Sequence, residues 1–169
     1  MTVTAELSSK AQAVEAAISD GKTNTGKALE QATLLTEQAA THGWTGMAAA
    51  MQGATDALDR TIASLGTAGD AITEALIALN AITEQTGRPQ VVEYLSQAII
   101  QFDSTQTVLD AAIGSLDGAR RAAEQAGSPE DFMVVLQGVN DDIDDAHRAA
   151  QDAKTAIESE RLEAASWGN

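Results

Sequence analysis

Apolar residues recur along most of this chain at alternating steps of three and four. The pattern is clearest near the C-terminus, where one stripe holds Phe132, Leu136, Val139, Ile143, Ala146, Ala150, Ala153 and Ile157. Steps that average 3.5 residues place apolar side chains along one face of an α-helix and are typical of a seam between helices. The stripe therefore predicts a long amphipathic helix that packs beside others.

The two preceding segments show the same rhythm. One stripe comprises Met47, Met51, Ala54, Leu58, Thr61, Leu65, Ala68, Ile72, Leu76 and Leu79. The next comprises Val91, Leu95, Ala98, Phe102, Thr105, Leu109, Ala112, Leu116, Ala119 and Ala123. The first segment is interrupted, because its stripe stops after Ile18 and resumes at Ala28. The residues between, 20–26, include two glycines and an asparagine, so this helix is either continuous or split in two.

Glycine-bearing sites separate the segments at Gly43, Gly87 and Gly127, and a proline follows two of them, at Pro89 and Pro129. Glycine readily ends a helix in the left-handed conformation, and proline suits the first turn of the next helix. These sites predict helices over residues 4–41, 45–85, 89–125 and 129–165.

Smaller signals refine these helices. Ser128 precedes Asp131 by three residues, which resembles a capping box. Two pairs of glycines, Gly66 with Gly69 and Gly114 with Gly118, fall near the middle of predicted helices. Because glycine costs about 1 kcal/mol against alanine in a helix, we interpret the pairs as points where helices cross closely.

Short connections between long helices make neighbours antiparallel. The predicted fold class is all-α, an elongated antiparallel bundle of about four long helices with coiled-coil-like seams. A length of 169 residues fits a single domain, 1–169. Within it, 1–86 would form a helical hairpin with a Trp-x-Gly turn, and 87–169 a second hairpin.

Charge narrows the classes of partner. The chain carries 25 acidic and 10 basic residues, a net charge of −15. Such a chain is repelled by nucleic-acid phosphates and anionic lipid surfaces, so we expect no nucleic-acid partner. We see no apolar stretch near the ~18 residues that span a membrane and expect no membrane insertion. Without a basic and then apolar leader, we expect a cytoplasmic protein, or one exported without a cleaved signal peptide.

Candidate chemistry is sparse. There are no cysteines and two histidines, His42 and His147. A di-iron site in a bundle needs two Glu-x-x-His pairs on facing helices, and His42 lies at a predicted turn. The acidic run 140–145 is either an exposed face or a cation site, and it lacks the glycine of a calcium loop. No glycine-rich phosphate loop is visible. We therefore predict no metal, no cofactor and no enzymatic activity.

Tryptophans are the candidate partner-binding residues. Trp44 lies in the predicted first turn with Gly46, and Trp167 lies near the C-terminus. Connections are usually polar, so a tryptophan there is unusual. Trp44 either packs over the helix ends or anchors a partner, since tryptophan is enriched at interface hot spots. Trp167 leaves the same two alternatives open.

Two helices of about 40 residues joined by Trp44-Thr45-Gly46 resemble the WXG100 or ESAT-6-like family. The resemblance covers residues 1–86 and implies a helical hairpin, dimerisation and export by a type VII secretion system. Family members are about half as long as this chain. Their export signal, Tyr-x-x-x-Asp/Glu, is absent, because Tyr94 is followed by Ala98 at the acidic position. The remaining residues resemble uncharacterised helical proteins of actinobacteria.

These patterns predict a non-enzymatic helical module that binds proteins, either by self-association, as a homo-oligomer, or by docking on a larger assembly. One alternative is a WXG-like substrate or chaperone of type VII secretion. Another is a carboxylate-based cation-binding protein or enzyme.

Overall fold

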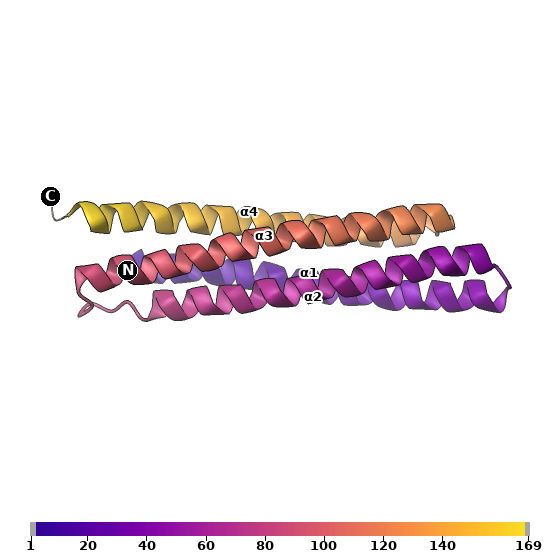
Figure 1. Ribbon diagram of the computed structural model, residues 1–169, viewed down its shortest axis with the longest axis horizontal. Coiled ribbons are helices and arrows are strands. Elements are labelled where there is room, and N and C mark those ends of the chain that lie inside the picture. Colours follow the sequence, from indigo (N-terminus) through magenta and orange to yellow (C-terminus); the bar gives the residue numbers. More distant parts are fainter. Residues whose placement is uncertain (1–2, 168–169) are drawn as a thin grey trace.

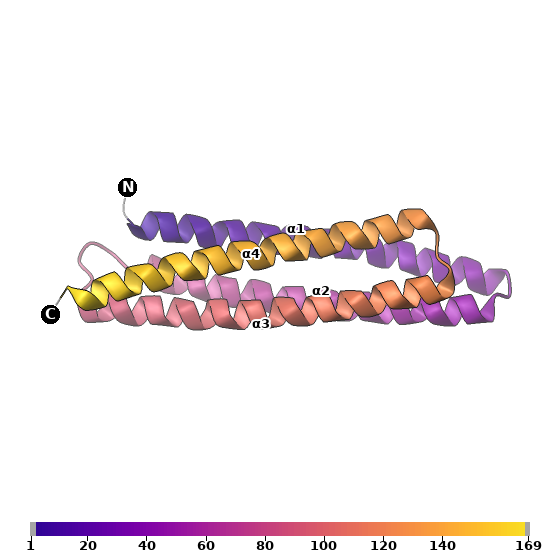
Figure 2. The same ribbon diagram turned by 90° about the horizontal axis from the view of Figure 1, so that it is seen from above.

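The computed structural model describes residues 3–167, which form four long helices. They are α1 (Val3–Thr41), α2 (Thr45–Asn80), α3 (Arg88–Ala126) and α4 (Glu130–Ser166). The helices lie side by side in an elongated bundle with alternating direction (Figures 1 and 2). α1 and α3 each pack against both α2 and α4. The all-α bundle of four long helices predicted from the apolar stripes is therefore confirmed.

The predicted stripes form the core. All eight stripe residues of α4 are buried, as is the α3 stripe from Leu95 onward. Two threonines interrupt the apolar stripes, and both hydroxyls are hydrogen-bonded. Thr61 donates to the Ala57 carbonyl at 2.9 Å, and Thr105 donates to the Gln101 carbonyl at 2.8 Å. A hydroxyl bonded four residues back within its own helix can be buried without leaving a polar group unpaired.

Helix α1 is continuous through residues 20–26. Gly21 and Thr25 are buried and carry the stripe from Ile18 to Ala28. The Thr25 hydroxyl donates to the Gly21 carbonyl at 2.6 Å. A Cβ on Gly21 would lie 3.8 Å from the Cβ of Asp142. Gly21 therefore marks a close approach of α1 and α4, and packing outweighs the low helix propensity of these residues.

Small residues bring α2 and α3 together. α2 buries extra alanines outside its predicted stripe, at Ala57, Ala71, Ala75 and Ala78. A Cβ on Gly53 would lie 3.6 Å from the Cβ of Ala122, and one on Gly118 would lie 3.9 Å from the Cβ of Ala57. These α2 and α3 side chains are short, so the two helices approach closely.

The close crossings expected at the paired glycines hold at Gly69 and Gly118. A Cβ on Gly69 would lie 3.9 Å from Cγ2 of Ile18 on α1, whereas one on Gly114 would meet no atom within 4 Å. One on Gly66 would meet only the mobile end of a lysine side chain, Nζ of Lys22, at 3.8 Å. Gly66 and Gly114 are therefore not needed for close packing.

Two of the three connections end their helices in the same way. Gly43 and Gly127 are left-handed, at φ 76° and 64°. The next amide in each turn bonds back across the glycine, from Trp44 to the Ala39 carbonyl and from Ser128 to the Ala123 carbonyl, at 2.9 and 3.1 Å. This six-to-one bond satisfies a free carbonyl at the helix end, as the glycine spacing predicted.

The second connection differs from the prediction. α2 ends at Asn80 rather than near residue 85, and Gly87 is extended at the start of α3 instead of ending α2. The Thr83 amide donates to the Thr86 hydroxyl at 2.8 Å, and the Thr86 amide donates to the Thr83 carbonyl at 3.0 Å. These turn bonds, one of them to a side chain, compete with helical ones, so the chain leaves the helix early.

The capping box at Ser128 does not form. Pro129 takes the N-cap position in an extended conformation, and no side chain caps α4. Ser128 Oγ has no hydrogen-bond partner. Proline moves the helix start one residue beyond the serine, out of reach of its hydroxyl.

The sequence analysis found no apolar stretch near the length that spans a membrane, and helix α2 corrects that observation. By length and composition alone it is apolar enough to span a membrane, the one such helix among residues 3–167. Core helices of soluble proteins meet the same criteria, and in this bundle α2 packs between α1 and α3. Its apolar character agrees with the twelve residues that it buries, more than any other helix of the bundle.

Polar contacts join α3 to α4. Lys154 Nζ lies 2.5 Å from Asp103 Oδ1, and His147 Nε2 lies 3.1 Å from Asp110 Oδ1. The hydrogen bond that Lys154 donates to Asp103 raises the pKa of Lys154 because it stabilises the charged ammonium, and partial burial acts in the opposite direction. Exposed pairs of this kind contribute up to about 1 kcal/mol, so they align the helices more than they stabilise them.

Replacing Phe102 with alanine should destabilise the bundle by about 3–5 kcal/mol, because a fully buried aromatic side chain leaves a cavity. The matched control is Ile100→Ala on the same helix, where the side chain is 63% exposed and the change should stay within about 0.5 kcal/mol. Urea denaturation followed by circular dichroism measures both. Equal losses would contradict the assignment of the core face of α3.

Two glycine substitutions should have opposite effects. Gly26→Ala should stabilise the protein by about 0.5–1 kcal/mol, because Gly26 lies inside α1 with open space around its Cβ position. Gly43→Ala should cost about 1–2 kcal/mol, because φ is positive there. Thermal and urea unfolding of the two variants measure the difference. A stabilising Gly43→Ala would contradict the left-handed turn.

Candidate functional site

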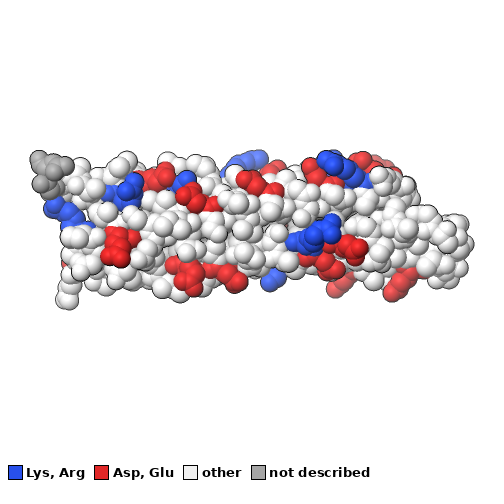
Figure 3. Space-filling view, viewed as in Figure 1, with Lys and Arg blue, Asp and Glu red and all other residues white. Residues whose placement is uncertain are grey.

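The turn between α1 and α2, with the adjoining helix ends, carries no formal charge. Residues 38–55 contain no Asp, Glu, Lys or Arg, the longest such run in a chain with 35 charged residues, 25 acidic plus 10 basic. They span the end of α1, the first turn and the start of α2. We call these residues the hairpin tip. Figure 3 shows the corresponding end of the molecule without red or blue atoms.

The hairpin tip projects beyond the other two helices. α4 starts beside α1 near Leu35, since Pro129 and Leu35 line the same hollow. Figures 1 and 2 both show the α1–α2 turn extending past the α3–α4 turn. Near its end, the tip is thus a pair of helices covered only by each other, which makes it accessible from several sides.

Trp44 lies at the apex of the hairpin tip. Its side chain is 55% exposed. The indole stacks on the His42 ring with centroids 4.7 Å apart and planes 22° apart. His42 is held in turn, because its Nδ1 lies 2.8 Å from the Gln38 carbonyl. The Trp44 indole therefore stacks on His42 beyond the end of α1 and is still more than half exposed.

Gly46 lies in the first turn of α2 and is exposed. A Cβ there would meet no heavy atom within 4 Å. Packing inside the chain therefore does not require glycine at this position. Met47 beside it turns inward and packs against the core.

Trp167 is far from this site. It follows the last residue of α4 and is 70% exposed. α4 ends at the opposite end of the bundle from the hairpin tip (Figure 1). The structure therefore separates the candidate residues into two sets, Trp44 with Gly46 at one end and Trp167 at the other.

The acidic run of α4 is engaged in separate local contacts. Asp142 accepts a 2.6 Å hydrogen bond from Asn24 of α1, and Asp144 accepts one from Asn140. Among residues 3–167, no group of three or more His, Asp or Glu side chains could hold a metal ion. Burial raises the pKa of Glu160, and the charge of Glu163 adds to the rise. Glu160 and Glu163 lie one turn apart on the last part of α4, remote from the hairpin tip.

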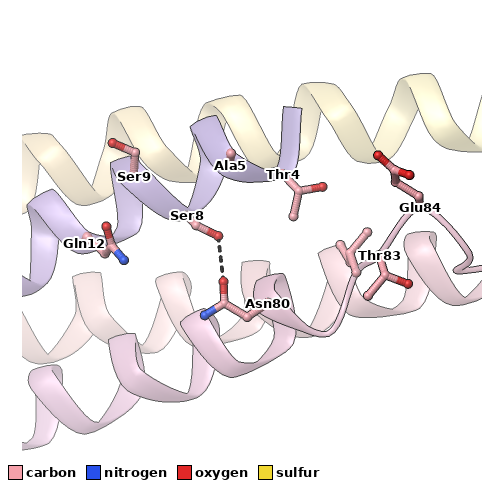
Figure 4. Close-up of a pocket in the computed structure, with 9 residues that line it drawn as sticks. Thr4, Ala5, Ser8, Ser9, Gln12, Asn80, Thr83 and Glu84 are labelled. Atoms are coloured by element: carbon pink, nitrogen blue, oxygen red, sulfur yellow. Dashed lines mark hydrogen bonds between the residues drawn. The ribbon is translucent and has the colours of Figure 1, made fainter. Parts of the chain in front are cut away.

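A polar hollow lies at the other end of the bundle, between the start of α1 and the end of α2. Thr4, Ser8, Ser9, Asn80 and Thr83 line it, and Glu84 is its one charged side chain (Figure 4). The Ser8 hydroxyl donates to Asn80 Oδ1 at 3.0 Å. Ser8 is therefore bonded to a neutral amide oxygen, which does not activate a hydroxyl as a general base would.

The sequence-based analysis missed two features of the hairpin tip. The first is its lack of charge, which the run without charged residues could have revealed. The second is the His42 stack, because two aromatic rings two residues apart around a glycine turn do not by themselves fix which surface each ring contacts.

Comparison with protein-family models, curated proteins and solved structures finds no match to this chain.

Proposed function

We propose that this chain is a non-enzymatic protein-interaction module that docks on a larger assembly through the hairpin tip, with Trp44 as the anchor. The observation that carries the proposal is an exposed but ordered tryptophan at the apex of a projecting, uncharged surface. An ordered indole loses little conformational freedom when it enters a pocket. Tryptophan is also among the residues most enriched at interface hot spots.

The lack of charge supports docking at this end. Burying an ionised group costs several kcal/mol unless it is paired, and residues 38–55 present none. Elsewhere the surface is strongly acidic and repels acidic partners and other copies of the chain. The expected partner is a protein with an apolar pocket that accepts an indole.

Self-association through the seams is the less favoured form of this proposal. The four apolar stripes are already buried against one another within one chain. A second copy is not needed to cover them. Light scattering and small-angle X-ray scattering over a wide concentration range distinguish the two forms, since seam-driven assembly would give a concentration-dependent rod.

Trp44→Ala should leave stability nearly unchanged, within about 1 kcal/mol, because the indole is largely exposed and stacks on one ring. The same change should weaken partner binding by about 2 kcal/mol or more. A photoreactive amino acid at the exposed position 45, beside an intact Trp44, should form one discrete adduct in the native host.

The matched control places the same photoreactive residue at Trp167, which is also exposed but lies at the opposite end. Identical adducts from both positions, or none from position 45, would contradict docking through the hairpin tip. Unfolding curves of both variants verify that the bundle remains intact.

A second candidate function is a WXG-like substrate or chaperone of type VII secretion. The supporting observation is that Trp44-Thr45-Gly46 lies in an exposed turn between antiparallel helices of 39 and 36 residues. Against it, Ala98, at the acidic position of the family's export signal, is buried in the core.

Export can be measured directly in a host with an active type VII system. This function predicts the protein in the culture medium, its loss from the medium when the system is inactivated, and reduced export of Trp44→Ala. Retention of the wild-type protein inside the cells would remove this candidate while leaving docking through the hairpin tip testable.

A further inference from the structure

A groove runs along the seam between α1 and α4 and meets the hairpin tip at Gln38. Two hollows form it, and both are lined by Gln31. The α1 side extends from Asn24 to Gln38, a rise of about 21 Å at 1.5 Å per residue. The α4 side extends from Asp142 back to Pro129. We call this surface the α1–α4 groove.

The groove opens because α1 and α4 separate beyond their close approach. They approach closely at Gly21, whose Cβ position is 3.8 Å from the Cβ of Asp142, and the Asn24–Asp142 hydrogen bond of 2.6 Å lies beside it. Figure 2 shows the two helices crossing near mid-length and diverging toward the α3–α4 turn. Gly138 then leaves the α4 side of the groove without a side chain.

The lining combines partly uncovered apolar side chains with amide and charged groups. Leu34 is 57% exposed, and Leu35 and Val135 are half-buried beside the buried Phe132 and Val139. A Cβ on Gly138 would meet no heavy atom within 4 Å, so the space above this backbone is open. An incoming backbone could approach closely there.

Acidic groups outnumber basic groups on the rim of the groove. Asp131 and Asp142 line the groove on the α4 side, and Lys27 faces them from α1. Asp142 accepts its bond from the neutral amide of Asn24, so that contact leaves its charge in place. With a net charge of −15 on the whole chain, a second copy would be repelled, whereas a basic partner would be attracted.

We propose that the α1–α4 groove binds an amphipathic helix of another protein, about four turns long, with apolar residues toward Leu34, Val135 and Gly138 and basic residues on its flanks. A groove of about 21 Å accommodates roughly 14 helical residues. Helices that bind grooves present apolar anchors at positions i, i+3 or i+4, and i+7. This site rests on observations separate from those at Trp44, so either can fail without the other.

The test uses an 18-residue helical peptide with leucine at positions i, i+3, i+4 and i+7 and lysine elsewhere, titrated into the full chain. Isothermal titration calorimetry gives the affinity, and amide chemical shifts map the site. The expected result is 1:1 binding with shifts concentrated at residues 24–38 and 129–142. A peptide with glutamate in place of lysine should bind at least tenfold more weakly.

Gly138→Leu places a side chain in the groove, since the Cβ position of Gly138 is open. It should lower the affinity for the lysine peptide at least tenfold. Gly114→Leu is the matched control, because Gly114 is an exposed mid-helix glycine on α3 with equally open space and should leave binding unchanged. Leu34→Gln is a second variant that removes exposed apolar lining and should also weaken binding. Trp44→Ala should retain it, which separates this site from the hairpin tip.

Equal binding to the Gly138→Leu and Gly114→Leu variants, or shifts spread over all four helices, would overturn the proposal, because attraction to the acidic surface as a whole would explain the binding. Equal affinity for the lysine and glutamate peptides would contradict the proposal that the partner helix carries basic residues on its flanks. A dimer in light scattering that Gly138→Leu abolishes would identify a second copy as the occupant and overturn the proposed partner.

Discussion

In the interior of the bundle the helices meet largely through alanine and glycine. Of the 34 buried hydrophobic residues in the part of the chain described, 17 are alanine. Each alanine buries little apolar area, so stabilisation per residue is small. Short side chains nevertheless let helices approach closely, and close approach gains dispersion contacts along the whole length. Long helices, continuous stripes and few aromatic residues all follow from this way of packing.

Because many small contacts along the whole helix stabilise this bundle, each helix needs neighbours along its full length. The ends of the bundle lack some of these neighbours. α1 and α2 extend past α3 and α4 at one end. The residues there have fewer neighbouring helices to cover them, and a small side chain such as Ala39 is nevertheless buried. The same extension brings Trp44 clear of the rest of the bundle, where no other helix can cover it.

Charge is distributed to match this arrangement. The acidic residues lie over the length of the bundle, whereas the hairpin tip has none. The α1–α4 groove reaches Gln38, where the hairpin tip begins. Two surfaces suited to other proteins therefore lie at the same end, one uncharged and one with acidic groups on its rim.

The sequence by itself determined the fold class, because a stripe repeated every 3.5 residues can be buried in one way only, along a helix that lies beside others. It located the stripes of α3 and α4 almost residue by residue and two of the three turns. It did not settle residues 20–26 or the end of α2. Those depended on Gly21 packing against α4 and on the bonds between Thr83 and Thr86, which are tertiary and loop contacts without a periodic signature.

The candidate sites divide in the same way. Trp44 and Gly46 were identified from the sequence because a tryptophan beside a glycine turn is unusual. Only the tertiary structure decided that Trp44 is exposed and stacked on His42, and that Trp167 lies at the far end. The α1–α4 groove was not predictable at all. It depends on how far two helices diverge after their closest approach, a property of their relative orientation that neither stripe contains.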